Sequence, residues 1–299
     1  MTSITTARYG KENVRVCKVE RDKRTGVHTV TEMTVTVLLE GAIESSYTKA
    51  DNSVIIATDS IKNTVYIKTK ENPVTPPERY AAVLGSHFIE TYSHITTAKV
   101  DIISDHWTRM EVSGQSHPHA FVRKGAERRL VQTEVGTGKI VVRSGLYDLA
   151  LLKSTGSQFN GFIRDEYTVL PDVWDRILST KVHCLWTWEL FASLGAVHAA
   201  APKFDEALTN AREITMKVFA EEESASVQNT MYKMCTQLLH AIPDVQAQDL
   251  APIHTFANAT LDLSWFHGMQ NLDQHAEVYL PQSSPNGLIE LKVSRANIL

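Results

Sequence analysis

Residues 31–41 read TEMTVTVLLEG, and the spacing of the apolar side chains in this stretch indicates the fold class. Met33, Val35, Val37 and Leu39 recur at every second position, with threonines between them at positions 34 and 36. Successive side chains of a strand point to opposite faces of a sheet, so this alternation predicts a strand with one buried face. We therefore expect a fold built around β-sheet.

Further strands are predicted by the same alternation or by runs of β-branched residues. Residues 63–72, NTVYIKTKEN, form one such run, and the polar residues 58–60 just before it are of the types that favour turns. The other strands are expected at residues 97–112, 119–124, 129–135, 139–155, 181–190, 260–266, 276–280 and 287–295.

Three stretches change to a helical period. In residues 78–95, Tyr80, Leu84 and Phe88 fall on one helical face, and residues 203–224 and 224–242 carry similar apolar stripes. The order of strands, helix and strands thus occurs twice along the chain. This predicts an α+β protein of two units, residues 1–137 and 138–299, with helices covering one face of the sheets.

Composition narrows the classes of function. The chain has 299 residues, a net charge of −4 and no Lys/Arg-rich block, so we expect no nucleic-acid partner. No apolar run approaches the roughly 20 residues of a membrane span. The first residues lack the apolar core of a signal peptide, and three scattered cysteines fit a reducing compartment. We therefore expect an intracellular protein without a membrane segment; its cysteines are Cys17, Cys184 and Cys235.

Two polar groups in the first half could carry chemistry. Lys11 precedes an alternating strand, where a lysine is usually a solvated flank. His117 and His119 are spaced to face one side of a strand and bind a metal, yet no Cys or acidic residue nearby completes a zinc set. A structured turn is the simpler interpretation of the two histidines.

The second half is richer in candidate ligand groups. Phe159 lies in a polar loop, where an exposed ring could stack on a planar ligand. Arg176, predicted to lie in a short helix, could grip a carbonyl-rich anion. Ser224 and Ser226 are plausible helix N-caps, and the nearby backbone N–H groups of Val227 and Gln228 would then attract an anion. Together these residues predict a pocket for a flat, anionic heterocycle.

Several stretches, in this order, resemble the urate oxidase (uricase) family, in particular its fungal-type eukaryotic members. The most specific are ATDSIKNT, LKSTGSQF and SVQNTMYKM; YGKENVR, HFIETY, HPHAF, DRILST and PNGLIELKV also match, so the likeness runs from about residue 8 to residue 295. The resemblance implies two tandem tunnelling-fold (T-fold) units. It also implies pairing of two chains into a barrel, a homotetramer and active sites at the interface between chains.

The resemblance further implies an activity and a set of site residues. The family oxidises urate with O2 to 5-hydroxyisourate and H2O2 in purine degradation, without metal or organic cofactor. By resemblance, one chain supplies Lys11 and Thr58 as a catalytic relay and Asp59 for substrate binding. The neighbouring chain supplies the rest of the substrate site, namely Phe159, Arg176, Val227 and Gln228. The resemblance also implies a peroxisomal location, although residues 297–299 do not match the usual address, and a cytoplasmic location is the alternative.

One segment departs from the family pattern. The family has an Asn and a His before its late Asp-Leu-Ser strand, whereas this chain reads LAPIHTFANATLDLSW at 250–265. Without a gap, Thr255 and Ala257 occupy these positions. With a short gap His254 takes the His position, and we favour this register, which makes His254 the third relay residue. The missing Asn leaves open an alternative function, a catalytically weakened purine-binding protein of the same fold.

A third interpretation is a T-fold enzyme that acts on pterins or GTP with zinc. Such an enzyme needs a convergent Cys/His set, and the only candidates are Cys184 with His117 and His119.

Overall fold

A computed structural model of the chain describes residues 3–256, 258–272, 275–282 and 287–295, with the backbone alone for residues 248–260. The strands are β1 (Tyr9–Arg21), β2 (His28–Gly41), β3 (Ile95–Val112), β4 (Gln115–Gly136), β5 (Lys139–Lys153), β6 (Leu178–Trp188), β7 (Val245–Phe256), β8 (Asn258–Thr260), β9 (Tyr279–Pro281) and β10 (Gly287–Ser294). The helices are α1 (Glu44–Thr48), the short 3-10 helix η1 (Asn52–Val54), α2 (Thr58–Glu71), α3 (Pro77–Thr91), α4 (Leu194–Ala199), α5 (Ala201–Glu221) and α6 (Val227–Ala241).

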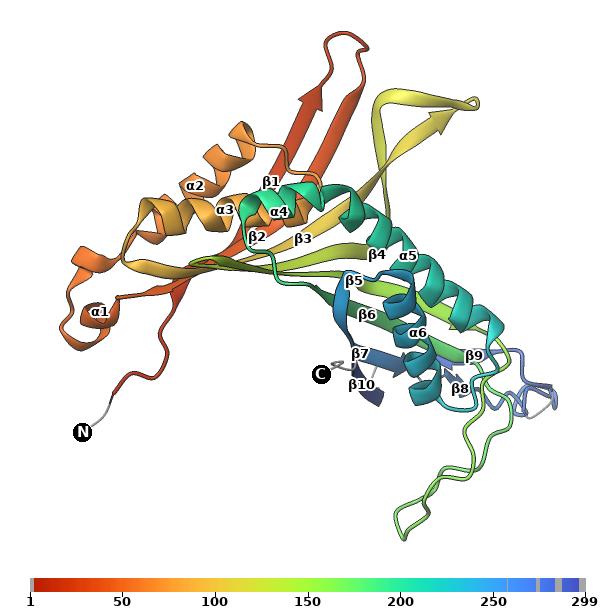
Figure 1. The fold of residues 1–299 in the computed structure, drawn as a ribbon. Coiled ribbons are helices and arrows are strands. Elements are labelled where there is room, and N and C mark those ends of the chain that lie inside the picture. The colour runs from red at the N-terminus through yellow and green to blue at the C-terminus, as the bar shows by residue number, and fades with distance from the viewer. Residues whose placement is uncertain (1–2, 257, 273–274, 283–286, 296–299) are drawn as a thin grey trace.

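Eight strands form one sheet in the order β1-β2-β3-β4-β5-β6-β7-β10, and every neighbouring pair is antiparallel. The longer helices lie over one face of this curved sheet, and the β1–β2 and β3–β4 hairpins project beyond it (Figure 1). This confirms the predicted α+β class, with an antiparallel sheet and helices on one face. Among the described strands, β1 and β10 are the two edges of the sheet.

The alternation in residues 31–41 determines which face of β2 is covered. Met33, Val35, Val37 and Leu39 are at most 1% exposed, whereas the threonines between them are half-buried on the other face. Burying each such side chain contributes roughly 1.5–3 kcal/mol. Helix α3 supplies part of the cover, since its residues at 80, 84 and 88 are fully buried, as their spacing predicts.

The structure corrects three predicted elements. Residues 63–72 are not a strand but most of helix α2, because Ile61, Val65 and Thr69 recur every four residues and are buried together. The predicted strand at 260–266 is mostly a turn, in which the Asp262 carboxylate accepts a hydrogen bond from the Ser264 N–H at 2.9 Å. The predicted short helix around residue 176 is an irregular loop.

Two hydrophobic cores lie between the sheet and the helices, one under α2 and α3 and one under α4, α5 and α6. A buried ion network joins the elements between them. The Arg129 guanidinium on β4 donates to the fully buried Glu78 of α3 and to Asp205 of α5, each at 2.6 Å. The two cores are therefore connected by ion pairs rather than separated by a linker.

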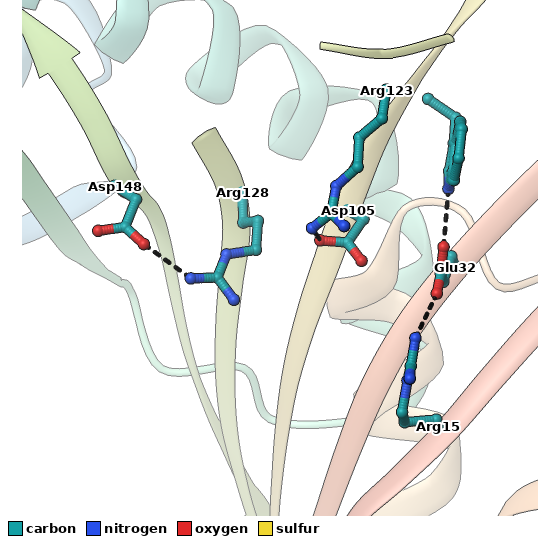
Figure 2. Close-up of polar contacts among 7 residues, drawn as sticks. Arg15, Glu32, Asp105, Arg123, Arg128 and Asp148 are labelled. Carbon is teal, nitrogen blue, oxygen red and sulfur yellow. Dashed lines mark hydrogen bonds and ion pairs between the residues drawn. The ribbon is translucent and has the colours of Figure 1, made fainter. Parts of the chain in front are cut away.

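The face of the sheet opposite the helices is polar. Figure 2 shows three ion pairs on its strands: Arg128 with Asp148 at 2.7 Å, Arg15 with Glu32 at 2.8 Å, and Arg123 with Asp105. Glu32 also accepts a hydrogen bond from the Trp107 indole at 3.0 Å. A face with this many charges is suited to contact with water rather than to packing against another apolar layer.

Candidate active site

Lys11 lies where β1 departs from regular pairing. It is opposite Val37 of β2, and the register shifts between Lys11 and Val14 at a β-bulge, where Asn13 has a φ of 58°. Bulges redirect side chains and are frequent beside active sites. The preceding residue must be glycine, because a Cβ on Gly10 would be 1.8 Å from the Val37 carbonyl oxygen. The backbone around this lysine is thus tightly constrained.

Thr58 and Asp59 are the first two residues of α2, so the predicted turn is in fact a helix start. The preceding residue, Ala57, has no side chain able to accept a hydrogen bond from the first turn. The N–H groups of residues 58–60 point away from the helix, and such an end attracts an anion. Both Thr58 and Asp59 are exposed.

The start of α2 is attached to the strand that carries Lys11. The Ile56 N–H donates to the Tyr9 hydroxyl at 2.8 Å, which ties the approach to the helix to β1. Asp59 accepts hydrogen bonds from Lys62 and from Asn63, the latter at 2.9 Å. Lys62 is the main cause that lowers the pKa of Asp59, and the charge of Lys11 adds to it. Lys11, Thr58 and Asp59, called here the N-terminal half-site, therefore occupy one corner of the molecule.

Phe159 and Arg176 meet in the long loop between β5 and β6. The Phe159 ring lies 5.1 Å below the Arg176 guanidinium carbon and stacks on Phe162 at 4.7 Å, with 12° between the planes. Paired backbone hydrogen bonds of 2.7 and 2.8 Å hold Phe159 against Val173. Burial lowers the pKa of Arg176, and among the described residues its buried Nε has no hydrogen-bond partner. This guanidinium is therefore able to take up a further acceptor.

The start of α6 is attached to the same loop. Ser226 is its N-cap and accepts a hydrogen bond from the Asn229 N–H, as its sequence position predicts. Val227 and Gln228 are the first two helical residues, so their N–H groups precede the intrahelical bonds. Phe159, Arg176, Val227 and Gln228 form what we call the C-terminal half-site. It offers a flat ring, a cation and a helix N-terminus, which together suit a planar anion.

The two half-sites are at opposite ends of one chain. Helix α2 packs on the edge strand β1, whereas α6 packs on β7 and the other edge strand, β10 (Figure 1). Six strands separate the two edges. A single chain therefore brings together the residues of each half-site but does not bring the two half-sites together.

The remaining predicted residues have different outcomes. The side chain of His254, in β7, lies outside the described residues, as do those of Thr255 and Asn258. His117 and His119 lie in β4 rather than in a turn, with ring centroids 4.6 Å apart. Cys184 is buried on β6, beneath the helices.

Two remaining expectations concern a metal site and a membrane-spanning helix. In the described part of the chain, no group of three or more His, Cys, Asp or Glu residues could hold a metal ion. Over the same residues, no helix is both long enough and apolar enough to cross a membrane.

Sequence reasoning missed the residues that hold the C-terminal half-site together. Asp175 accepts hydrogen bonds from Thr155 and Gly156, and Ser224, one of the two predicted N-caps, does not cap α6 but pairs with Ser157 ahead of it. A signal was available, since a Ser-Thr-Gly-Ser loop and an Asp beside an Arg are typical of local side-chain-to-backbone bonding. An aspartate next to an arginine, however, is also common on any solvated surface.

Comparison with known proteins gives one consistent result. The sequence model described as "Uricase" matches residues 7–134 and 142–290. The uricase of Aspergillus flavus is 55% identical, with 100% of this chain and 99% of that protein covered, and the uricase of Cyberlindnera jadinii is 40% identical, with 98% and 97% covered. The crystal structure of the Arthrobacter globiformis uricase superposes with a TM-score of 0.87 at 31% identity, covering 99% of this chain and 96% of that one. This chain belongs to the uricase family.

Proposed function

We propose that this chain oxidises urate with O2 and water to 5-hydroxyisourate and H2O2, as a step of purine degradation that needs no metal or organic cofactor. Family membership supports the reaction, and one structural observation supports its mechanism: the two half-sites lie at opposite edges of the sheet. One end of the chain has groups suited to hold a planar anion, and the other end has a lysine and a threonine suited to move protons.

The C-terminal half-site holds the substrate in this proposal. Urate is flat and anionic, so Phe159 stacks on its rings and the Arg176 guanidinium donates to a carbonyl and a ring nitrogen. Gln228 and the Val227 N–H bind the opposite edge, at the positive end of α6. Held as a dianion, urate is electron-rich and supplies the electrons that reduce O2.

The N-terminal half-site moves the protons. A threonine hydroxyl is a poor base by itself, so the Thr58 Oγ1 needs the Lys11 amine to accept its proton and return it. Asp59 contributes its backbone to the binding of the purine, and its carboxylate, held by Lys62 and Asn63, fixes the first turn of α2. His254 is the proposed third member of the relay. The variant His254→Ala tests this role and should lower kcat more than it raises the Kd for urate.

Assembly completes the site. The edge strands β1 and β10 of two chains would pair to close a barrel, which brings β1 of one chain beside β10 and α6 of the other. The polar face of the sheet would then line the inside of the barrel. Two barrels would stack as a homotetramer. The long β5–β6 loop supports a large contact between chains, because Ile163 and Val169 are 92% and 95% exposed and Trp174 is 70% exposed.

The first test is turnover by purified protein, followed as loss of urate absorbance with parallel detection of H2O2. We expect one H2O2 for each urate consumed. Urate binding without turnover would contradict the proposed activity and would favour the weakened-binding alternative, for which the comparisons offer no support.

A mixing experiment then tests the division of the site between chains. Lys11→Met damages only the N-terminal half-site, and Arg176→Gln damages only the C-terminal one, so each variant alone should be nearly inactive. In a mixed dimer, one of the two sites combines the intact halves of both chains. Co-refolding equal amounts should restore about one quarter of the wild-type activity. If mixing restores none, the site does not lie between chains.

Two further parts of the proposal concern the boundary between the two T-fold units and the location of the protein in the cell. We place the boundary of the two T-fold units between residues 137 and 138, in the tight β4–β5 turn. A peroxisomal location suits an enzyme that releases H2O2. Fluorescence microscopy of the fused full chain, compared with a peroxisomal marker, tests it against a cytoplasmic location.

A further inference from the structure

Asp175 immediately precedes Arg176 and bonds to the loop that leaves β5. Its carboxylate accepts a hydrogen bond from the Thr155 hydroxyl at 2.6 Å and from the Gly156 N–H at 2.8 Å. The backbone N–H groups of Ser157 and Arg176 also face this carboxylate. One exposed side chain thus faces four hydrogen-bond donors at the two ends of the long loop, three from residues 155–157 and one from Arg176.

From Gly156 the hydrogen bonding continues to α6. The Ser224 N–H donates to the Gly156 carbonyl at 2.9 Å, and the Gln158 N–H donates to the Ser224 carbonyl at 2.8 Å. The hydroxyls of Ser224 and Thr230, the latter on the first turn of α6, are 2.8 Å apart and buried. Gly156 has a φ of +73°, which residues with a side chain rarely adopt.

Arg176 is attached to the same loop on the other side. Its N–H donates to the Ser157 carbonyl at 2.8 Å, and its guanidinium lies over Phe159. Residues 155–157 therefore connect the two parts of the C-terminal half-site, the arginine and the start of α6. The Asp175 carboxylate is the group that holds this connection in its turned conformation.

We propose that Asp175 is a positioning residue, whose carboxylate sets the separation between the Arg176 guanidinium and the N–H groups of Val227 and Gln228. The identification of the positioned ligand as urate rests on the proposed function. Asp175 need not touch the ligand. In this proposal Asp175 holds the Phe159 ring, the Arg176 guanidinium and the start of α6 in the arrangement that binds the ligand, even when no ligand is present. Less conformational entropy is then lost when the ligand binds.

Charged groups lie on several sides of the Asp175 carboxylate and bear on its protonation state. The Lys153 ammonium, at the end of β5, faces Asp175, and it donates to the Glu222 carbonyl at 2.7 Å. Glu222 and Glu223 face Lys153 from the segment before α6, and Lys233 of α6 pairs with Glu222. The Thr155 hydroxyl bond is the largest cause that lowers the pKa of Asp175. The carboxylate therefore remains ionised at neutral pH and loses its bonds only in acid.

The experiment compares Asp175→Asn with wild type and with Asp22→Asn. Asp22 is a matched control in the β1–β2 hairpin, because its carboxylate likewise accepts from a threonine hydroxyl, that of Thr25 at 2.8 Å, and from backbone N–H groups. A carboxamide cannot accept on both its terminal atoms, so Asp175→Asn must break part of the network. Thr155→Val removes one bond only and serves as a milder variant.

Three quantities are measured on the full-length protein: the Kd for xanthine as a non-reacting purine, KM and kcat for urate, and amide hydrogen exchange of Gly156 and Ser224. For Asp175→Asn we expect Kd and KM to rise about 10- to 100-fold, a smaller change in kcat, and faster exchange at both amides. Thr155→Val should fall between wild type and Asp175→Asn, and Asp22→Asn should match wild type.

The outcomes separate this inference from the proposed function. If wild type neither turns over urate nor binds xanthine, the proposed function fails, and exchange at Ser224 still decides whether Asp175 orders the loop. If wild type is active but Asp175→Asn keeps its Kd, KM and exchange rates, the positioning role is overturned. A uniform rise of exchange across the molecule, rather than one centred on Gly156 and Ser224, would also overturn it, because that pattern indicates global destabilisation.

Discussion

The two half-sites differ in how much of their geometry is built within one chain. In the C-terminal half-site, backbone bonds from residues 156–158, the Ser226 cap and the Asp175 carboxylate hold the ligand groups in place. In the N-terminal half-site, Thr58 begins a helix whose preceding residue is alanine, and both Thr58 and Asp59 are exposed. The groups of one half are connected by hydrogen bonds within their own chain, and the other half presents exposed groups at an edge of the sheet.

This difference suggests a division of labour. Binding benefits from groups fixed in advance, because less freedom is lost when the ligand arrives. Proton transfer requires the relay to meet the substrate at hydrogen-bond distance, and in the proposed assembly the relay comes from another chain. The substitutions below alter one half-site at a time and test whether urate binding and turnover can be changed separately.

The largest effect is expected from Lys11→Met. Without the amine the Thr58 hydroxyl has no proton acceptor, so kcat should fall about 100- to 10,000-fold. The Kd for xanthine should change less than about threefold, since the ring-holding groups belong to the other half-site. Stopped-flow and steady-state absorbance measure the first quantity and equilibrium dialysis the second.

The matched control is Lys70→Met, on the exposed side of α2. It removes an equal charge and should leave kcat within about twofold. If Lys11→Met weakens xanthine binding as strongly as it slows turnover, the two functions are not divided between the half-sites.

Arg176→Gln should give the opposite pattern. Loss of a charged hydrogen bond, worth about 1.5–3 kcal/mol, should raise KM for urate and Kd for xanthine roughly 10- to 100-fold. Isothermal titration with xanthine checks the binding, and kcat at saturating urate should fall much less. Arg164→Gln, farther along the same loop, is the control, and a similar loss of binding in that variant would argue against a specific role.

A smaller effect is expected from Phe159→Leu, which keeps an apolar side chain but removes the stacking face. Such ring contacts contribute about 0.5–1.5 kcal/mol, so affinity for xanthine should fall roughly 2- to 12-fold. Phe162→Leu tests whether the neighbouring ring supports Phe159 from behind, and it should cost less. Equal losses would indicate that the two rings bind as one unit.

The smallest effect concerns the stability of the two half-sites toward acid. Asp59 and Asp175 both have a lowered pKa in the folded chain, so each stabilises the fold above the unfolded pKa of about 4 and loses that contribution as the pH falls through its folded value. The melting temperatures of Asp59→Asn and Asp175→Asn should therefore lie below wild type at neutral pH and converge with it as the pH falls below the folded pKa of each carboxyl. Added salt should reduce the difference for Asp59, whose hydrogen-bond partner is the Lys62 ammonium, more than for Asp175, whose hydrogen bonds come from uncharged donors and which the Lys153 ammonium only faces.

Periodicity predicted the fold well where one face of an element is buried. The alternation at 33–39 and the helical stripe at 80–88 correspond to fully covered side chains. The prediction was wrong for 63–72, where Val65 and its β-branched neighbours favour a strand locally but their four-residue spacing suits packing on β1. Tertiary packing outweighed local preference there.

The candidate site was harder to predict from the sequence than the fold. Spacing alone suggested that Phe159, Arg176 and the start of α6 could hold a flat anion, and the structure brings these residues together. The residues alone favoured a solvated strand flank for Lys11 and a turn for Thr58, and their roles in the site entered through family resemblance. The bulge at Asn13 and the bonds of Asp175 depend on partners in other segments of the chain, so a local pattern can suggest such bonding but cannot name the partner.

The buried guanidinium of Arg129 has a consequence for how the chain unfolds. It joins α3 to α5 across β4, and the pairing of β4 with β5 is continuous from Arg128 to Gly136. Unfolding either half would strip a partner from the buried Glu78 and expose the flank of a neighbouring strand. We therefore expect thermal denaturation of this chain to be a single cooperative transition, even though the order of strands, helix and strands occurs twice along its sequence.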